Sequence, residues 1–333
     1  MAQKRPTLAD VAAAAGVSKA AVSRVINDAP GVSARTRARV QEVIARLGFR
    51  PDSVARALAS GHGDVVELVI LDDPSVFASS PYYGRVTAGI LQELAGRNAQ
   101  LRVHVVEEPD APGLLAKVAE TASVGVLLSN VPPALVGEFY ARCDRVVTLG
   151  PSAPGVPYVD VENADGAYTA VKHLYESGRR RIAALHGADS NPDAVARRDG
   201  YRRAVLELGL PEISATGKFR LESGHELTLR LVAEEPGIDA LFVACDLMAA
   251  GSLQALAEVG RRVPEDVALV GFDDSLIATC TTPPMSSVHQ PVEEMAAAAT
   301  RALVNRQVAP YWRCVFPADL RVRRSSEVPG QRG

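Results

Sequence analysis

The first fifty residues contain three short segments in which apolar residues recur every three or four positions, a spacing that predicts three short amphipathic helices. Thr7, Ser18 and Ser33 stand where these helices would begin, and their hydroxyls can accept hydrogen bonds from N–H groups of the first turn. Gly16 and Gly48 stand where the first and third helices would end. Two helices joined by a short turn at a glycine are typical of a helix-turn-helix, whose second helix enters the DNA major groove. The apolar positions are Leu8, Val11, Ala12 and Ala15, then Val22, Val25 and Ile26, then Val40, Val43, Ile44 and Leu47.

A short helix is also predicted in residues 49–63. Pro51 ends the third helix, Asp52 or Ser53 can cap the next one, and the glycines at 61 and 63 close it. Such a helix has barely two turns and is too short to be stable alone. We expect it to become ordered when DNA and a partner hold it.

From Val65 onward, short apolar runs alternate with amphipathic stretches. Apolar strands joined by helices predict parallel sheets that are covered on both faces. About 270 residues is long for one such sheet, so we expect two sheets with a cleft between them. Ligands of parallel sheets bind at the carboxyl ends of the strands. The strand-like runs are 65–71, 101–106, 124–129, 145–150, 180–187, 240–246 and 267–274, and helical patterns include 84–97, 164–177, 196–209, 246–260 and 291–306.

The distribution of charge changes the picture that the net charge of −3 gives. Residues 1–61 contain ten Lys and Arg but four Asp and Glu, which makes this segment +6, whereas the remainder is −9. A basic segment attached to an acidic body is typical of a nucleic-acid-binding module. A solvated basic tail is the alternative, but the helical periodicity of the segment argues against it.

Several classes of protein are disfavoured by features that the sequence lacks. The start, MAQKRPTLAD, has no apolar segment typical of a secretory signal, and no stretch approaches roughly 18 uninterrupted apolar residues. We therefore expect a cytoplasmic protein without a membrane span. The four cysteines are far apart and form no CxxC pair, and the histidines do not cluster with them, so we expect free thiols, no metal and no cofactor. The cysteines are Cys143, Cys245, Cys280 and Cys314.

Motifs along nearly the whole chain resemble the LacI/GalR transcriptional regulators. TLADVAAAAGVSKAAVSRVIN (7–27) is similar to their DNA-binding head, and VARAL (54–58) to their hinge helix. CDLMAAG (245–251), RVPEDVALVGFDD (262–274), PPMSSVHQP (283–291) and PADLRVRRSS (317–326) resemble their ligand-binding core. The resemblance implies an α plus α/β fold, with a three-helix helix-turn-helix head, a hinge helix and two doubly wound parallel-sheet subdomains of periplasmic-binding-protein type I. It also implies a homodimer that binds a palindromic operator, by default as a repressor, under the control of a small effector such as a sugar or a metabolite.

The resemblance also implies domain bounds. The head would span 1–51, the hinge helix and linker 52–62, and the effector-binding and dimerisation core 63–333. Within the core, the N-subdomain would take about 63–161 and 292–319, and the C-subdomain about 163–289 and 321–333. The chain would cross between them near 161–163, 289–292 and 319–321. Only EVPGQRG follows Ser326, without a leucine heptad, so we expect a dimer.

The DNA contacts are expected from the second helix and the hinge. Lys19 and Ala20 match the family's base-reading pair; lysine can contact guanine O6 or N7, whereas alanine offers only apolar contact, for example to a thymine methyl. Arg24 can reach a base edge or a phosphate. Leu58 matches the hinge leucine, an apolar wedge in the minor groove, and a core leucine of a short helix is the alternative. The hydroxyls of the helix caps could contact phosphates or serve as caps alone. The implied set is Thr7, Leu8, Ser18, Lys19, Ala20, Ser23, Arg24, Asn27, Ala55 and Leu58.

The resemblance places an effector site in the cleft. Arg197 and Asp273 would supply an arginine fork and an acid, and aromatic side chains would cover the ligand, which suits a polyhydroxylated ring. A structural ion pair between Arg197 and Asp273, and aromatics that belong to the core, are the alternatives. The implied set is Tyr82, Tyr83, Arg197, Phe219, Asp273 and Gln290, with Ser129 as a weaker candidate and Glu162 where an Asp is common.

Two positions in the cleft depart from the family pattern. Cys245 stands where many members carry Asn or Ser, and Gly150 stands where many carry Asp. With two hydrogen-bonding groups lost, a ligand less polar than a typical sugar, or another signal, becomes an alternative.

Two other classes of function compete with a regulator. A solute-binding protein for transport would share the core, but the first 61 residues and the absence of a signal argue against it. An enzyme could use Asp273 and Asp274 as acid and base, but the sequence has no nucleophile–base arrangement, phosphate loop or metal spacing.

Overall fold

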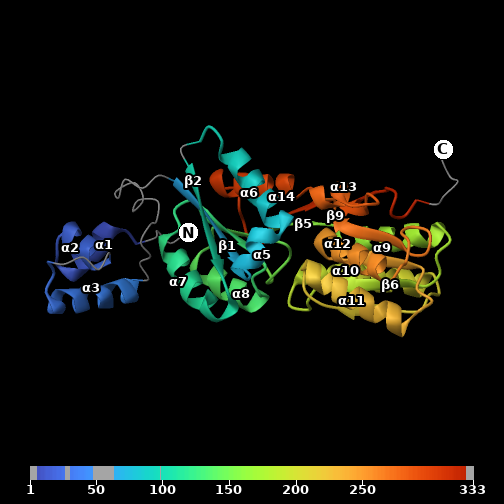
Figure 1. Ribbon diagram of the computed structural model, residues 1–333. Helices are drawn as coiled ribbons and strands as arrows, with labels where there is room; N and C mark the ends of the chain where they lie inside the picture. Colours follow the sequence, from blue (N-terminus) through green and yellow to red (C-terminus); the bar gives the residue numbers. More distant parts are fainter. Residues whose placement is uncertain (1–5, 27–30, 48–63, 98, 328–333) are drawn as a thin grey trace. The chain divides into compact units, whose positions relative to one another are not determined.

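The computed structural model describes residues 6–26, 31–47, 64–97 and 99–327. The chain divides into two compact units, Met1–Gly63 and Asp64–Gly333, and each is described by itself (Figure 1). None of the described helices is long and apolar enough to cross a membrane.

The described part of the first unit contains three helices, and each begins at the expected cap. The N–H of Asp10 donates to the Thr7 hydroxyl, and the Asp10 carboxylate accepts from the Thr7 N–H, which makes a capping box. Gly16 ends the first helix at a φ of 61°, a conformation that glycine adopts without a steric cost. The hydroxyls of Ser18 and Ser33 accept from N–H groups three residues further on. The helices are α1 (Leu8–Ala15), α2 (Lys19–Ile26) and α3 (Ala34–Leu47).

The apolar faces of the three helices pack into one small core, as their periodicity predicts. Arg39 of α3 adds a polar tie, because its guanidinium donates to the carbonyl oxygens of Ala15 and Gly16 at the end of α1. The turn between α1 and α2 is thereby fixed on α3. The buried core residues are Val11, Ala12, Ala15, Val22, Val25, Val40 and Val43.

The described strands of the second unit form two six-stranded sheets, of strand order β11–β5–β4–β3–β1–β2 and β12–β10–β9–β8–β6–β7. All neighbours pair in parallel except β10 and β12, which are antiparallel. The first sheet, sheet A, contains β1 (Asp64–Leu71), β2 (Ala99–Val106), β3 (Gly125–Ser129), β4 (Val146–Leu149), β5 (Tyr158–Val161) and β11 (Arg313–Phe316). The second, sheet B, contains β6 (Ile182–His186), β7 (Ile213–Thr216), β8 (Ala240–Val243), β9 (Ala268–Asp273), β10 (Ser286–His289) and β12 (Asp319–Arg321).

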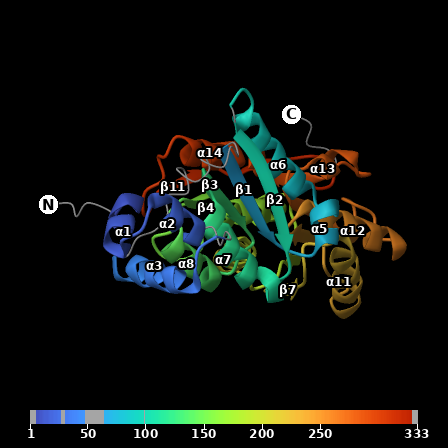
Figure 2. The same ribbon diagram turned by 90° about the vertical axis from the view of Figure 1, so that its left-hand side faces the viewer.

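Helices cover both faces of each sheet, which is the doubly wound arrangement that the sequence predicts. In sheet A, one face packs against α6 and α14 and the other against α7 and α8 (Figures 1 and 2). In sheet B, one face packs against α9 and α10 and the other against α11 and α12. These helices are α6 (Pro81–Leu94), α7 (Ala111–Thr121), α8 (Pro133–Arg142), α9 (Asn163–Glu176), α10 (Pro192–Glu207), α11 (Leu221–Glu234), α12 (Asp246–Glu258) and α14 (Val292–Val304), and the shorter α5 (Pro74–Ser79), η1 (Glu108–Asp110) and α13 (Leu276–Cys280) lie between them.

The chain passes between the two sheets three times. It leaves sheet A after β5 and enters α9, and it returns from β10 of sheet B into α14, which packs on sheet A. The third passage leads from β11 to β12 and lies between Phe316 and Asp319, whereas the sequence analysis expected it near 319–321. The second unit therefore has two halves, one built on each sheet, and the residues at these passages connect them.

Candidate functional site

One face of α2 carries four of the residues that the sequence analysis assigned to DNA contact. Val22 and Val25 are buried in the core of the first unit, so the opposite face of the helix is turned outward. Residues four apart in a helix lie side by side, and this spacing relates Lys19 to Ser23 and Ala20 to Arg24. Lys19, Ala20 and Arg24 are exposed, and Ser23 is half-buried.

The start of α1 offers fewer donors to a phosphate than its residue types imply. The hydroxyl and the N–H of Thr7 both donate to the Asp10 carboxylate, each over 2.7 Å. The N–H of Leu8 has no acceptor among the described residues and remains a donor at this helix end. Ser18 is exposed and caps α2. The predicted contacts of Asn27, Ala55 and Leu58 fall outside the described residues.

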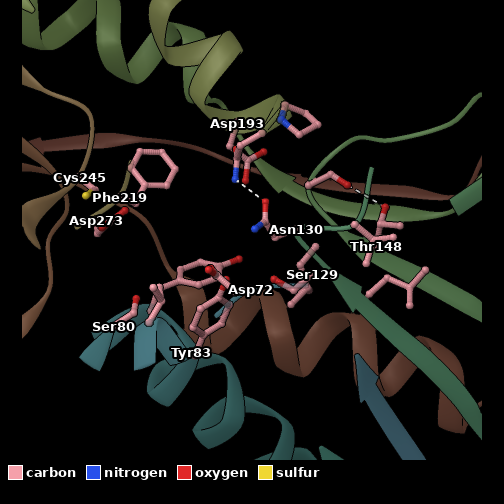
Figure 3. A pocket seen from close by; sticks show the side chains of 18 of the residues that line it. Asp72, Ser80, Tyr83, Ser129, Asn130, Thr148, Asp193, Phe219, Cys245 and Asp273 are labelled. Carbon is pink, nitrogen blue, oxygen red and sulfur yellow. Dashed lines mark hydrogen bonds between the residues drawn. The ribbon is translucent and has the colours of Figure 1, made fainter. Parts of the chain in front are cut away.

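A cleft of about 960 Å³, part of it open to solvent, lies within the second unit (Figure 3). Its walls follow the carboxyl ends of strands from both sheets, because Asp72 follows β1, Gly150 follows β4 and Asp273 ends β9. This is the place where parallel sheets bind ligands. Lining residues on the side of sheet A include Asp72, Ser80, Tyr82, Tyr83, Ser129, Asn130, Thr148, Gly150 and Ser152, and those on the side of sheet B include Asn191, Asp193, Arg197, Phe219, Cys245, Leu247, Asp273 and Ser275.

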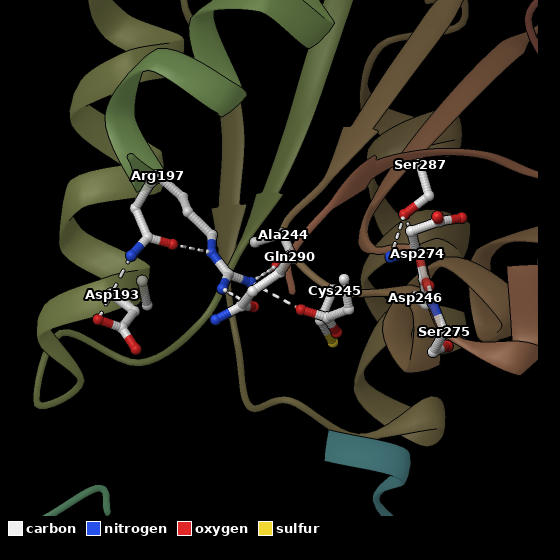
Figure 4. A network of polar contacts seen from close by, with 12 residues as sticks. Asp193, Arg197, Ala244, Cys245, Asp246, Asp274, Ser275, Ser287 and Gln290 are labelled. Atoms are coloured by element: carbon white, nitrogen blue, oxygen red, sulfur yellow. Dashed lines mark hydrogen bonds and ion pairs between the residues drawn. The ribbon is translucent and has the colours of Figure 1, made fainter. Parts of the chain in front are cut away.

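Arg197 is the centre of the polar network behind the cleft (Figure 4). Its Nε donates to Asn163 Oδ1 over 2.7 Å, and its Nη1 donates to the carbonyl of Ala244 over 2.6 Å. Nη1 also contacts the Asp273 carboxylate at 3.3 Å, and Nη2 donates to Gln290 Oε1 over 3.1 Å. The side chain is 4% exposed. Four of the five guanidinium N–H groups are thus occupied within the protein, one of them by the ion pair with Asp273.

Aromatic rings surround the guanidinium and one wall of the cleft. Phe272 covers the Arg197 guanidinium at 3.7 Å, and Phe219 lies 5.9 Å from it. On the other wall, the buried Tyr83 hydroxyl donates to the Asp72 carboxylate over 2.8 Å, and its ring packs against that of Tyr82. Tyr82 and Phe219 are half-buried, so their rings keep surface that a ligand can cover.

Asp273 reaches the cleft from a turn with an unusual backbone. Asp273 and Asp274 have φ values of 109° and 48°. Asp246, which is 1% exposed, holds the turn by accepting from the N–H of Ser275 over 2.7 Å and from the hydroxyl of Ser287 over 2.6 Å. Burial raises the pKa of Asp273, and the Arg197 charge opposes that shift. Asp273 thus belongs to the cleft and Asp246 to its support.

The paired acid Asp274 has a different task. Its carboxylate contacts the guanidinium of Arg323 at 2.6 Å and the ring of His289 at 3.0 Å. It does not line the cleft. Asp274 therefore ties the end of β9 to β10, through His289, and to the segment after β12, through Arg323. These contacts leave no geometric basis for Asp273 and Asp274 as a catalytic acid and base.

The remaining expected residues are placed unequally. Ser129 lines the cleft, but Gln290 is 1% exposed and lies behind Arg197, and Glu162 is exposed outside the cleft. Cys245 lines the cleft as the cap of α12, where its Sγ accepts from the N–H of Met248 over 3.5 Å. Burial raises the pKa of this thiol, so it stays protonated.

Gly150 is the second departure from the family pattern, and a carboxylate from another element lies beside it. A Cβ at position 150 would lie 2.8 Å from Asp193 Oδ1. Asp193 stands in the first turn of α10, after the cap Asn191. Position 150 itself offers no hydrogen-bonding side chain, but Asp193 brings a carboxylate to the same place from the opposite wall.

Several lining residues escaped the sequence analysis although the chain carries a signal for them. Asp72 and Asn130 directly follow two predicted strands, and Asn191 and Asp193 open a helix that follows a third. The rule that ligands bind at strand ends applies to all four positions. No group of His, Cys, Asp or Glu among the described residues could hold a metal ion.

Comparison with known proteins agrees with these features. Residues 7–52 match the lacI family of bacterial regulatory proteins, and residues 171–326 match a periplasmic binding protein-like domain. The HTH-type transcriptional regulator CelR of Thermobifida fusca is 36% identical over 97% of this chain and 99% of its own length. Catabolite control protein A of Priestia megaterium is 31% identical over 96% of this chain and 99% of its own length.

Solved structures show the same architecture. A complex of the regulator CelR with cellobiose has a TM-score of 0.74 and 34% identity, and the match covers 96% of this chain and all of that one. A lac repressor dimer bound to operator and an anti-inducer has a TM-score of 0.72 and 26% identity over 97% of this chain and 99% of that one. CelR and the Bacillus subtilis protein DegA are both named as HTH-type transcriptional regulators, which favours neither a transport protein nor an enzyme. The chain therefore belongs to the LacI family of DNA-binding transcriptional regulators.

Proposed function

We propose that this regulator is a cytoplasmic homodimer that represses transcription at a palindromic operator, and that a small sugar in the cleft changes its affinity for DNA. The head would span 1–51, the hinge segment 52–62 and the core 63–333. The core would divide at the bounds expected above, except that the third passage lies between Phe316 and Asp319. Lys19, Ala20 and Arg24 would read or position the DNA from the exposed face of α2, and Leu58 would open a central base step.

The observation that carries the proposal is the position of Arg197 between the cleft and two passages of the chain. Asn163 follows the first passage out of sheet A, and Gln290 precedes the second passage back to it. Arg197 donates to both. A ligand that contacts Arg197 or its partner Asp273 therefore acts on groups that belong to both halves of the core. Such contacts would differ in free energy between two arrangements of the halves, which is the condition for a ligand to shift them.

A sugar suits the chemistry of the walls. Tyr82 and Phe219 offer ring faces, and Asp193, Asp273 and Ser129 offer oxygen acceptors for hydroxyl groups. The related regulator CelR has been solved as a complex with cellobiose, which makes cellobiose a reasonable first probe. The effector-binding set that we propose is Tyr82, Tyr83, Arg197, Phe219 and Asp273, with Gln290 as the support of Arg197.

The test uses the full chain and an operator selected by it from random DNA duplexes. The selected sequence should be a palindrome, and the DNA affinity and the melting temperature should change with cellobiose or another neutral sugar of a panel. A chain that selects no palindrome, or whose DNA affinity responds to none of the sugars, contradicts the proposal.

Lys19→Ala separates base reading from phosphate contact. The variant should lose discrimination at one base position of each half-site, about 10- to 100-fold, because a bidentate lysine contact distinguishes guanine from other bases. Equal weakening for all sequences would assign Lys19 to a phosphate instead. Lys117→Ala, a change in α7 of the core, is the matched control.

A further inference from the structure

The cleft has little capacity left for an anionic ligand. Arg197 is the only Lys or Arg among the described lining residues, and its contacts leave one guanidinium N–H unoccupied. Phe272 covers one face of the guanidinium. A phosphate or carboxylate is best held by a fork of two parallel N–H groups, and Arg197 offers no such fork.

The acidic side chains of the cleft differ in how far their acceptor sites are filled. Asp72 accepts from the Tyr83 hydroxyl, and Asp273 contacts Arg197. Asp193 receives a single long contact, from Asn163 Nδ2 at 3.5 Å, and no described basic side chain forms an ion pair with it. Asp193 therefore has the largest unmet capacity to accept hydrogen bonds among the lining carboxylates.

A second acid, Asp160, lies beside Asp193. The Asp160 carboxylate accepts two hydrogen bonds from the protein, from the N–H of Val161 over 2.8 Å and from Asn163 Nδ2 over 2.9 Å. The orientation of the Asn163 amide is set by Arg197, which occupies its oxygen, so its nitrogen faces the two acids. Burial raises the pKa of Asp160, and the neighbouring Asp193 charge adds to the shift. Asp160 therefore keeps its proton near neutral pH, and the negative charge of this pair resides on Asp193, whose pKa burial raises only to about 6.

We propose that Asp193 determines effector specificity: its carboxylate takes the place of a side chain at Gly150, accepts hydrogen bonds from hydroxyls of an uncharged saccharide, and excludes phosphorylated or carboxylated sugars. The inference deepens the proposed function and rests on it. The missing side chain at position 150 gives the carboxylate room, since a Cβ there would lie 2.8 Å from Asp193 Oδ1. The two departures from the family pattern thus do not make the cleft apolar. The carboxylate expected at position 150, after β4, is replaced by that of Asp193 in the first turn of α10.

The test compares cellobiose with cellobiose phosphorylated at O6 of its nonreducing ring, using the full chain and calorimetric affinities. The wild type should bind cellobiose at least about tenfold more tightly than the phosphate. Asp193→Asn, which keeps the size of the side chain, should weaken cellobiose binding by about 10- to 100-fold and reduce the preference over the phosphate. The control is Asp189→Asn, whose carboxylate is exposed and pairs with Arg198 outside the cleft. It should bind both sugars as the wild type does.

The outcomes separate failure of the specificity role of Asp193 from failure of the proposed function. Unchanged cellobiose affinity in Asp193→Asn, or equal affinity of the wild type for both sugars, overturns the specificity role while the proposed function stands. A wild type that binds no neutral saccharide of the panel refutes the sugar effector and this inference with it. Asp193→Ala serves as a second variant, and melting without sugar shows whether either variant has lost its fold.

Discussion

The side-chain amide of Asn191 donates a hydrogen bond to the side-chain oxygen of Asn130 over 3.1 Å, across the cleft that both residues line. Asn130 follows β3 of sheet A, and Asn191 caps α10 on sheet B. A second contact joins the same two sides, because Arg220 Nη2 lies 3.4 Å from an oxygen of Asp73. These contacts hold the walls of the cleft in register, so their strength should enter the affinity for any ligand between them.

Asn191→Asp tests the first of these contacts. Aspartate can still cap α10 by accepting from the N–H of Ala194, but it places an acceptor against the Asn130 oxygen. One hydrogen bond contributes about 1 kcal/mol, so the affinity for cellobiose should fall about fivefold. Titration calorimetry measures the change, and Asn191→Ser, which removes the contact without adding charge, should give a similar loss. An affinity equal to that of the wild type in both variants would show that the contact does not contribute.

Arg197→Lys should damage both the core and its response to sugar. An ammonium group cannot reach Asn163, the Ala244 carbonyl and Gln290 together, so buried acceptors lose their donors. We expect the free energy of unfolding to fall by about 3 kcal/mol and the effect of cellobiose on DNA affinity to vanish. Arg198→Lys is the control in the same helix, because its partner Asp189 is exposed. Chemical denaturation and DNA titration measure the two effects, and a normal sugar response would remove Arg197 from the signalling path.

Gly150→Ala should affect the cleft more than backbone strain alone explains. Gly150 has a φ of 99°, and Gly178 has a φ of 96° with no atom near its missing Cβ. Both substitutions should lower the free energy of unfolding by about 1 kcal/mol through strain. Only Gly150→Ala should also weaken cellobiose binding, because its methyl group would displace the Asp193 carboxylate. Equal affinities in the two variants would contradict the close approach between positions 150 and 193.

His186 should make the fold sensitive to acid. Its ring is 1% exposed, neither ring nitrogen has a hydrogen-bond partner among the described residues, and burial lowers its pKa from 6.5 to about 4. Between pH 6.5 and 4 the unfolded chain binds a proton that the folded chain does not, so stability falls as the pH falls through this window. The loss reaches at most about 3 kcal/mol.

His186→Leu removes this titration. Urea denaturation at several pH values between 7 and 4 should show a shallower decline of the free energy of unfolding in the variant. An identical pH dependence in both chains would show that the histidine is not what makes the fold acid-sensitive. The measurement needs neither DNA nor sugar, so its result is independent of the proposed function.

Local sequence was sufficient to predict the first unit because its caps, glycines and apolar periodicity act within a few residues of one another. The longer strands of the second unit were predicted for the same reason. β5, β7 and β10 were not predicted, because polar residues interrupt their apolar pattern, whereas the equally short β4 and β8 lie in longer apolar runs. Helices α6 and α10 begin earlier than expected, at Pro81 and Pro192, since proline is favoured in the first turn.

The cleft was predictable only in part. Arg197, Phe219 and Asp273 could be named from the resemblance, and the structure brings them together. The occupation of the Arg197 fork and the approach of Asp193 to Gly150 depend on contacts between residues that are distant in the chain. No local pattern encodes such contacts, so the carboxylate beside Gly150 could not be foreseen when a less polar ligand was kept as an alternative.

The backbone of the turn at Asp273 and Asp274 has a consequence for the evolution of this site. Two non-glycine residues at positive φ cost about 1 to 3 kcal/mol each, and buried Asp246 offsets that cost during folding. The ligand therefore meets a preorganised carboxylate and need not order it on binding. The same arrangement sets up a trade-off, because substitutions that relax the turn would raise the stability of the protein and lower its affinity for the effector.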